Sequence, residues 1–78
     1  MLLSSLPVST RCRVTGIQAH PRASRRLAAF GLLPGCLIQI LRSGKSALVI
    51  EIRGSFLALS RELAAGIIVA REEDAYER

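Results

Sequence analysis

The chain has 78 residues, enough for one small domain near the lower size limit of a self-sufficient hydrophobic core. Half of the residues are hydrophobic and three are aromatic, so a compact core of Leu, Ile and Val can form without a disulfide or a metal. The formal net charge is +5. Residues 1–70 carry nine basic and two acidic side chains, whereas residues 71–78 carry two basic and four acidic ones. This asymmetry fits an anionic partner, a tail folded back over the body, or a merely solvated basic surface.

No segment has the features of a targeting signal or a membrane span. The N-terminus lacks the basic region and the long apolar stretch of a signal peptide. No apolar run approaches the roughly 20 residues needed to cross a bilayer. We therefore expect a soluble protein of the cytoplasm.

The first predicted element is a strand at Thr10–Ala19. Val14 and Ile17 are three residues apart, which breaks strict alternation, and a bulge around Thr15-Gly16 would return both to one face. The strand ends before the His20-Pro21 pair, because Pro suits the first turn of a helix.

The next element is a helix at Pro21–Phe30, with Leu27 and Phe30 one turn apart on its buried face. Gly31 can close the helix because it adopts positive φ without a Cβ clash. Leu32 then falls between the helix and the next strand, where it can plug the junction.

Short strands at close spacing follow a type II turn expected at Pro34-Gly35. The predicted strands are Cys36–Arg42, Ala47–Arg53, Phe56–Ser60 and Gly66–Ala70. A tight connection at Gly54-Ser55 joins the middle two as a hairpin. A single helical turn is expected at Arg61–Ala65, with Ser60 as its N-cap.

Alternation along these strands assigns the core. The side chains expected to be buried are Ile38, Ile40, Leu48, Ile50, Ile52, Leu57, Leu59, Ile67 and Val69. About five short strands with one helix after the first predict a mainly β fold, a small, partly open antiparallel barrel. Such barrels fill their interior with side chains, so any binding must use the outer surface.

Residue types that catalyse reactions or bind metals are few. The one histidine, His20, lies in a turn, and the acids Glu51 and Glu62 are isolated, so we expect no enzyme activity. Cys12, His20 and Cys36 could meet at a metal in three dimensions, but their spacing matches no zinc motif. We favour two buried thiols, and we expect no metal and no other cofactor.

Ten of the 11 basic residues are arginines, which can hold phosphate groups. The sequence offers no aromatic platform on which bases would stack, so nucleic-acid binding is the alternative and not the first hypothesis.

Motifs spread along the chain resemble one known family. Residues 2–7 read Leu-Leu-Ser-Ser-Leu-Pro, residues 31–35 read Gly-Leu-Leu-Pro-Gly, and residues 53–59 read Arg-Gly-Ser-Phe-Leu-Ala-Leu. Together with Glu62 and the apolar residues up to Val69, this combination resembles the FeoA family over nearly the whole chain.

The resemblance implies an SH3-like barrel over residues 1–70, followed by a polar acidic tail at residues 71–78. It also implies a non-enzymatic, cytosolic accessory protein of bacterial ferrous iron uptake. Such a protein docks on the cytosolic GTP-binding domain of the transporter FeoB and modulates the transporter. The chain departs from the family in the short turn at Ser43–Ser46 and in Phe30, where Leu is common and core packing tolerates the change.

Alternation also predicts a docking surface. The apolar side chains expected to face outward and form one patch are Leu37, Leu41, Val49 and Ile68. The arginines expected on the polar face of the helix, where they would steer an acidic partner, are Arg22, Arg25 and Arg26. The alternative is that the patch is covered by the N-terminal segment, by the tail, or by a second copy in a homo-oligomer.

Overall fold

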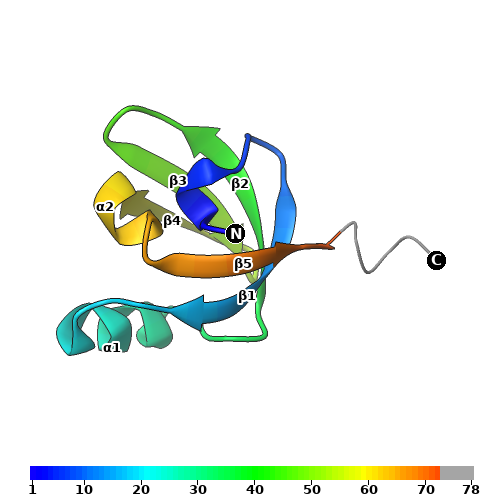
Figure 1. Ribbon diagram of the computed structural model, residues 1–78. Coiled ribbons are helices and arrows are strands. Elements are labelled where there is room, and N and C mark those ends of the chain that lie inside the picture. The colour runs from blue at the N-terminus through cyan, green and yellow to red at the C-terminus, as the bar shows by residue number, and fades with distance from the viewer. Residues whose placement is uncertain (73–78) are drawn as a thin grey trace.

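The computed structural model describes residues 1–72, in which five strands form one antiparallel sheet in the order β4-β3-β2-β1-β5 (Figure 1). The elements are η1 (Leu3–Ser5), β1 (Arg11–Ile17), α1 (Pro21–Ala29), β2 (Leu37–Ser43), β3 (Ala47–Ile52), β4 (Ser55–Ser60), α2 (Arg61–Ala64) and β5 (Ile67–Arg71). The boundaries agree with the predicted ones to within about two residues. Most of the predicted tail, residues 73–78, lies outside the described residues.

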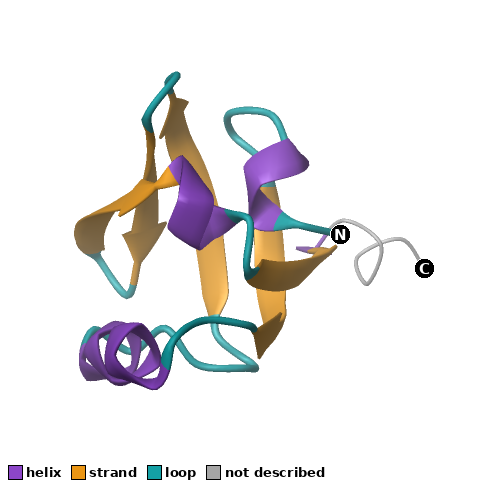
Figure 2. Cartoon of the chain, turned by 60° about the vertical axis from the view of Figure 1, so that its left-hand side comes forward, coloured by secondary structure: helices purple, strands orange, loops and turns teal. Residues whose placement is uncertain are grey.

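The sheet curls around the core, and the helices take different places on it. Figures 1 and 2 both show α1 at one end of the molecule, while η1 and α2 lie near each other on the curled sheet. No helix in residues 1–72 is long and apolar enough to cross a membrane. The sequence order of the elements, with one helix after the first strand, is as predicted.

The core consists of the side chains that alternation assigns to it. Eight of the nine predicted residues are buried, and Leu57 is half-buried and packs against the others. The N-terminal segment, β1 and the α1–β2 connection add further buried side chains: Leu3, Leu6, Cys12, Val14, Leu27 and Leu32.

The predicted bulge in β1 is confirmed. Val14 pairs with Val69 and Gly16 pairs with Ile68, so the register between β1 and β5 shifts between Val14 and Gly16. The extra residue returns Ile17 to the inner side, where it packs against the core.

The C-terminus of α1 shows why the prediction for Phe30 is wrong. The amide of Gly31 (φ 91°) donates to the carbonyl of Ala28 (2.9 Å), and the amide of Leu32 donates to that of Leu27 (3.0 Å). This pair of hydrogen bonds is a Schellman motif, which places the residue after the glycine against the last turn of the helix. Leu32 therefore continues the core, and Phe30 is 57% exposed.

The turns differ in how well the sequence predicts them. Gly35 has a φ of 101° and the amide of Cys36 donates to the carbonyl of Leu33 (3.1 Å), as a type II turn requires. The β3–β4 hairpin turns at Arg53 (φ 53°) and Gly54 (φ 82°), not at Gly54-Ser55 as predicted. Two consecutive residues with positive φ form a type I′ turn, whose twist matches that of the flanking strands.

Arg61 joins three segments that are distant in the sequence. Its guanidinium donates from Nη1 to Ser43 Oγ (3.0 Å) and to the Gly44 carbonyl (2.8 Å), and from Nη2 to the Ser4 carbonyl (2.6 Å). One side chain thereby ties α2 to the β2–β3 turn and to η1. Ser60 caps the same helix as predicted, since its hydroxyl accepts from the amide of Leu63 (3.0 Å).

Replacing Ile50 by Ala should lower the free energy of unfolding by about 2–5 kcal/mol, because the side chain is fully buried and a small core cannot close the cavity. Urea unfolding followed by circular dichroism measures the change. A loss below about 1 kcal/mol would contradict the assignment of Ile50 to the centre of the core.

Replacing Arg61 by Lys should lower the free energy of unfolding by about 1–3 kcal/mol, since an ammonium group cannot reach all three acceptors that the planar guanidinium serves. The matched control is Arg26→Lys, because Arg26 is exposed on α1. Equal unfolding midpoints for the two variants would show that the Arg61 contacts do not stabilise the fold.

Candidate functional site

The arginines of α1 form a cationic surface at one end of the molecule. Arg22, Arg25 and Arg26 are all exposed, and Leu27 is the one buried side chain of the helix. The helix begins with His20 as N-cap, whose Nδ1 accepts a hydrogen bond from the amide of Arg22 (3.1 Å). The charged side chains of α1 therefore face solvent, while Leu27 holds the helix against the core.

The predicted apolar patch is not one surface. Leu37 is 46% exposed, whereas Leu41, Val49 and Ile68 are only partly exposed. Between Leu37 and the other residues of β2 and β3 lies the polar pair Gln39 and Glu51, which face each other in the ladder.

Leu41 and Ile68 are separated from the other residues of the predicted patch for different reasons. The β2–β3 register shifts between Ile40 and Arg42, which makes Leu41 the extra residue of a bulge. Ile68 lies on the far side of β1, where it pairs with Gly16 and bridges to Leu2. The N-terminal segment therefore lies beside Ile68 at the edge of β5.

Three exposed apolar side chains at the α1 end were missed by the sequence interpretation. They are Phe30, Leu33 and Phe56, and Phe56 is 72% exposed. Leu33 precedes the glycine turn before β2, and Phe56 follows the β3–β4 turn, whose Arg53 packs next to Gly31. The Gly31 motif was the available signal for Phe30, because a Schellman motif buries the residue after the glycine instead.

A shallow hollow of about 180 Å³ lies on the outer face of the sheet next to these residues. It is lined by Arg11, Leu37, Ile38, Gln39, Glu51, Arg53 and Glu72. Arg13 joins its edge, since its Nη2 lies 3.7 Å from Glu72 Oε1. Leu37 therefore lies among charges of both signs, an arrangement typical of the rim of a protein interface.

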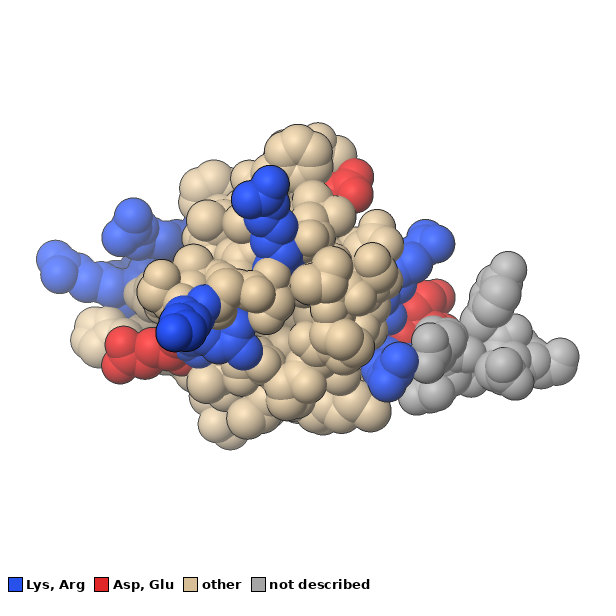
Figure 3. All heavy atoms as spheres, turned by 90° about the horizontal axis from the view of Figure 1, so that it is seen from above, with Lys and Arg blue, Asp and Glu red and all other residues tan. Residues whose placement is uncertain are grey.

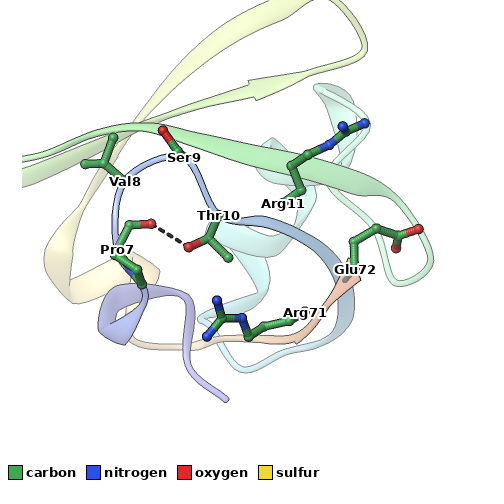
Figure 4. Close-up of a pocket in the computed structure, with 7 residues that line it drawn as sticks. All are labelled: Pro7, Val8, Ser9, Thr10, Arg11, Arg71 and Glu72. Carbon is green, nitrogen blue, oxygen red and sulfur yellow. Dashed lines mark hydrogen bonds between the residues drawn. The ribbon is translucent and has the colours of Figure 1, made fainter. Parts of the chain in front are cut away.

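A larger hollow of about 610 Å³ lies where the chain enters β1, and it shares Arg11 and Glu72 with the smaller one (Figure 4). It is lined by Pro7, Val8, Ser9, Thr10, Arg11, Arg71 and Glu72. The Thr10 hydroxyl donates to the Pro7 carbonyl (2.7 Å), and Figure 4 shows the Arg71 guanidinium lying toward this turn while Arg11 extends away from it. The two guanidinium groups do not converge on a common anion.

Of the three residues considered for a metal site, the two cysteines are neighbours and His20 lies apart from them. Cys12 is near the start of β1, and Cys36 is diagonal to it across the β1–β2 pair, whereas His20 lies beyond the opposite end of β1. Both cysteines are free; Cys12 is buried and Cys36 is half-buried. Burial raises the pKa of the Cys12 thiol from 9.0 to about 11, with a further contribution from Cys36. In residues 1–72, no three His, Cys, Asp or Glu side chains group as a metal site would require.

Comparisons with known proteins agree on one family. The FeoA domain family matches residues 1–71. The solution structure of FeoA from Chlorobium tepidum is 32% identical, with a TM-score of 0.85 over 92% of this chain and 70% of that one. The FeoA of Stenotrophomonas maltophilia, solved with zinc and described as a prokaryotic SH3 domain protein, is 26% identical, with a TM-score of 0.79 over 90% of this chain and 89% of that one. The predicted SH3-like fold is confirmed.

Other structural neighbours are parts of larger proteins. A manganese-dependent transcriptional repressor is 19% identical, with a TM-score of 0.84 over 91% of this chain and 41% of the repressor. That likeness shows the fold alone. No curated protein matches the chain.

The buried thiol of Cys12 gives an expected pH dependence. Between pH 9 and about 11, the unfolded chain releases the Cys12 proton while the folded chain retains it, so the folded state binds more protons. The free energy of unfolding should therefore fall as the pH rises through this range. Denaturant unfolding at several pH values should show a shallower fall for Cys12→Ala than for the parent. Equal slopes would contradict the expectation.

Proposed function

Since this chain belongs to the FeoA family, which is associated with ferrous iron transport, we propose that it is a non-enzymatic accessory protein of bacterial ferrous iron uptake. In this proposal it acts in the cytoplasm, docks on the cytosolic GTP-binding domain of a FeoB-type transporter, and modulates the transporter. The observation that carries the proposal is the match to the FeoA domain over residues 1–71, which is nearly the whole chain.

Two features of the surface support docking rather than catalysis. Within residues 1–72 the barrel interior is filled by side chains such as Ile40, Ile50 and Ile67, which favours binding at the outer surface. The α1 end combines exposed arginines with exposed apolar side chains, and protein interfaces use such a combination for steering and for affinity.

We assign the two roles to different residues. Arg22, Arg25 and Arg26 steer the approach of an acidic surface, because exposed charges act at long range and mainly on the association rate. Leu37 supplies apolar contact, together with the neighbouring Phe30, Leu33 and Phe56. Leu41, Val49 and Ile68 contribute less, because they are mostly covered.

The second candidate is a basic module that binds nucleic acid or another phosphate-bearing partner. The surplus of arginine and the fold shared with a repressor favour it. The face seen in Figure 3 argues against it, since Lys and Arg there stand in separate groups around mostly uncharged surface. Nucleic acids bind best to a continuous basic stripe.

The steering role predicts a kinetic effect. Arg25→Glu combined with Arg26→Glu should slow association with the purified cytosolic domain of the transporter by roughly tenfold at low salt, and less at high salt. Surface plasmon resonance gives both rate constants. The matched control, Arg42→Glu with Lys45→Glu, makes the same change in net charge at exposed residues away from α1.

Equal slowing by both double variants would show that net charge acts rather than α1. Binding of the parent to duplex or single-stranded DNA, but not to the transporter domain, would favour the second candidate. Such a complex would weaken steeply as salt rises.

The apolar role predicts an effect on dissociation. Leu37→Ser should raise the dissociation rate without unfolding the barrel, because the side chain is nearly half exposed and removed from the core. The control is Val8→Ser, because Val8 is a similarly exposed apolar residue in the connection between η1 and β1. Unchanged dissociation of a folded Leu37→Ser variant would exclude this residue from the docking surface.

A further inference from the structure

The two edge strands of the sheet, β5 and β4, differ in whether another segment of the chain covers them. On the free edge of β5, the amide of Val69 donates to the carbonyl of Met1 (2.8 Å), and the N-terminal ammonium donates to the carbonyl of Val69 (3.1 Å). Leu2 adds a bridge to Ile68 on the same edge. The N-terminal segment therefore covers the edge of β5.

The other edge strand, β4, has none of the usual protecting features within the described residues. Its sequence, Ser-Phe-Leu-Ala-Leu-Ser at residues 55–60, contains no charge and no proline. Its pairing with β3 runs without a register shift, whereas the β1–β5 and β2–β3 pairs each contain one. Natural sheets protect exposed edges with charges, prolines, bulges or covering segments, so an uncovered regular edge marks a place where another strand can be added.

The hairpin geometry identifies which backbone groups are available. In a two-residue hairpin the residues that flank the turn, here Ile52 and Ser55, form a hydrogen-bonded pair, and such pairs alternate along the strands. Ser55, Leu57 and Leu59 therefore direct their amides and carbonyls toward β3. Phe56 and Ala58 direct theirs toward the open edge, and both residues are exposed.

We propose that the β4 edge pairs with the β4 edge of a second copy of this chain, in antiparallel orientation about a two-fold axis at Leu57. In this register Phe56 of each copy lies opposite Ala58 of the other. The amides and carbonyls of both residues, four groups in each copy, then all form hydrogen bonds across the two-fold axis. The exposed Phe56 ring then lies next to a small side chain, twice by symmetry. The two sheets become one continuous sheet of ten strands.

Charge favours this antiparallel arrangement. Arg53 lies just before β4 and Glu62 just after it, and both are exposed. Antiparallel pairing brings each Arg53 to the end that carries the other copy's Glu62, whereas parallel pairing would bring like charges together. Arg61 does not disturb the match, because its guanidinium is bound to the β2–β3 turn and to η1.

The central test is Ala58→Pro, which removes an amide that the monomer does not use for its own sheet. Sedimentation velocity at rising concentrations should show a monomer–dimer equilibrium for the parent. The variant should weaken association by roughly tenfold or more, because two of the four hydrogen bonds between the copies are lost. The matched control, Ala58→Ser, keeps the amide and should associate like the parent.

A charge exchange tests the orientation independently. Arg53→Glu and Glu62→Arg should each weaken the dimer, and the double variant should restore it. Amide hydrogen exchange of the unaltered chain needs no substitution: Phe56 and Ala58 should exchange more slowly at high concentration than after dilution.

A parent chain that stays monomeric up to millimolar concentration overturns the proposal, as does an Ala58→Pro variant that remains dimeric. If the parent is monomeric but Ala58→Pro weakens binding to the transporter domain, the edge serves a strand of that partner and not a second copy. Phe56 belongs to both proposed surfaces, so the two proposals are separated by variants that leave Phe56 unchanged: Ala58→Pro tests the dimer, and Leu37→Ser tests docking on the transporter.

Discussion

The guanidinium of Arg61 holds together parts of the fold that the sheet alone does not connect. It binds the β2–β3 turn on one side and the Ser4 carbonyl of η1 on the other. Fixing η1 also fixes the residues before it, and these pair with β5 at Val69. The Arg61 contact to η1 and the backbone pairing of residues 1 and 2 with β5 together hold the N-terminal segment against that edge of the sheet.

Side chains from every part of the described fold fill the core. Residues from every strand, from η1 and from the α1–β2 connection meet in one cluster. The exposed charges, the exposed apolar side chains and the edge strand lie on different parts of the surface. Charges gather on α1, large apolar side chains surround the α1–β2 connection and the β3–β4 turn, and β4 is an edge strand of the sheet formed by the described residues. A small accessory protein can contact more than one partner in this way, because these surfaces do not overlap fully.

Local rules account for most of what could be predicted. Period-2 alternation identified the buried side chains of β2, β3 and β5, because successive side chains of a strand point to opposite faces and only one face packs on the core. The spacing of Val14 and Ile17 identified the β1 bulge. Where two local rules competed, the prediction was wrong: helical spacing assigned Phe30 to the core, but the Schellman hydrogen bonds buried Leu32 instead. The hairpin turn was misplaced by one residue, because positive φ at Arg53 is uncommon for a residue other than glycine.

By itself, the sequence determined the fold class, the core and the resemblance to FeoA, since each is encoded in patterns of neighbouring residues. Only the tertiary structure decided which outward residues share a surface. Alternation predicts that Leu37, Leu41, Val49 and Ile68 all face away from the core. In the structure, the pair Gln39 and Glu51 separates Leu37 from Leu41 and Val49, and strand β1 separates Ile68 from the residues of β2 and β3. Register between distant strands is set by bulges and by long-range contacts such as those of Arg61, and neither leaves a periodic signal in the chain.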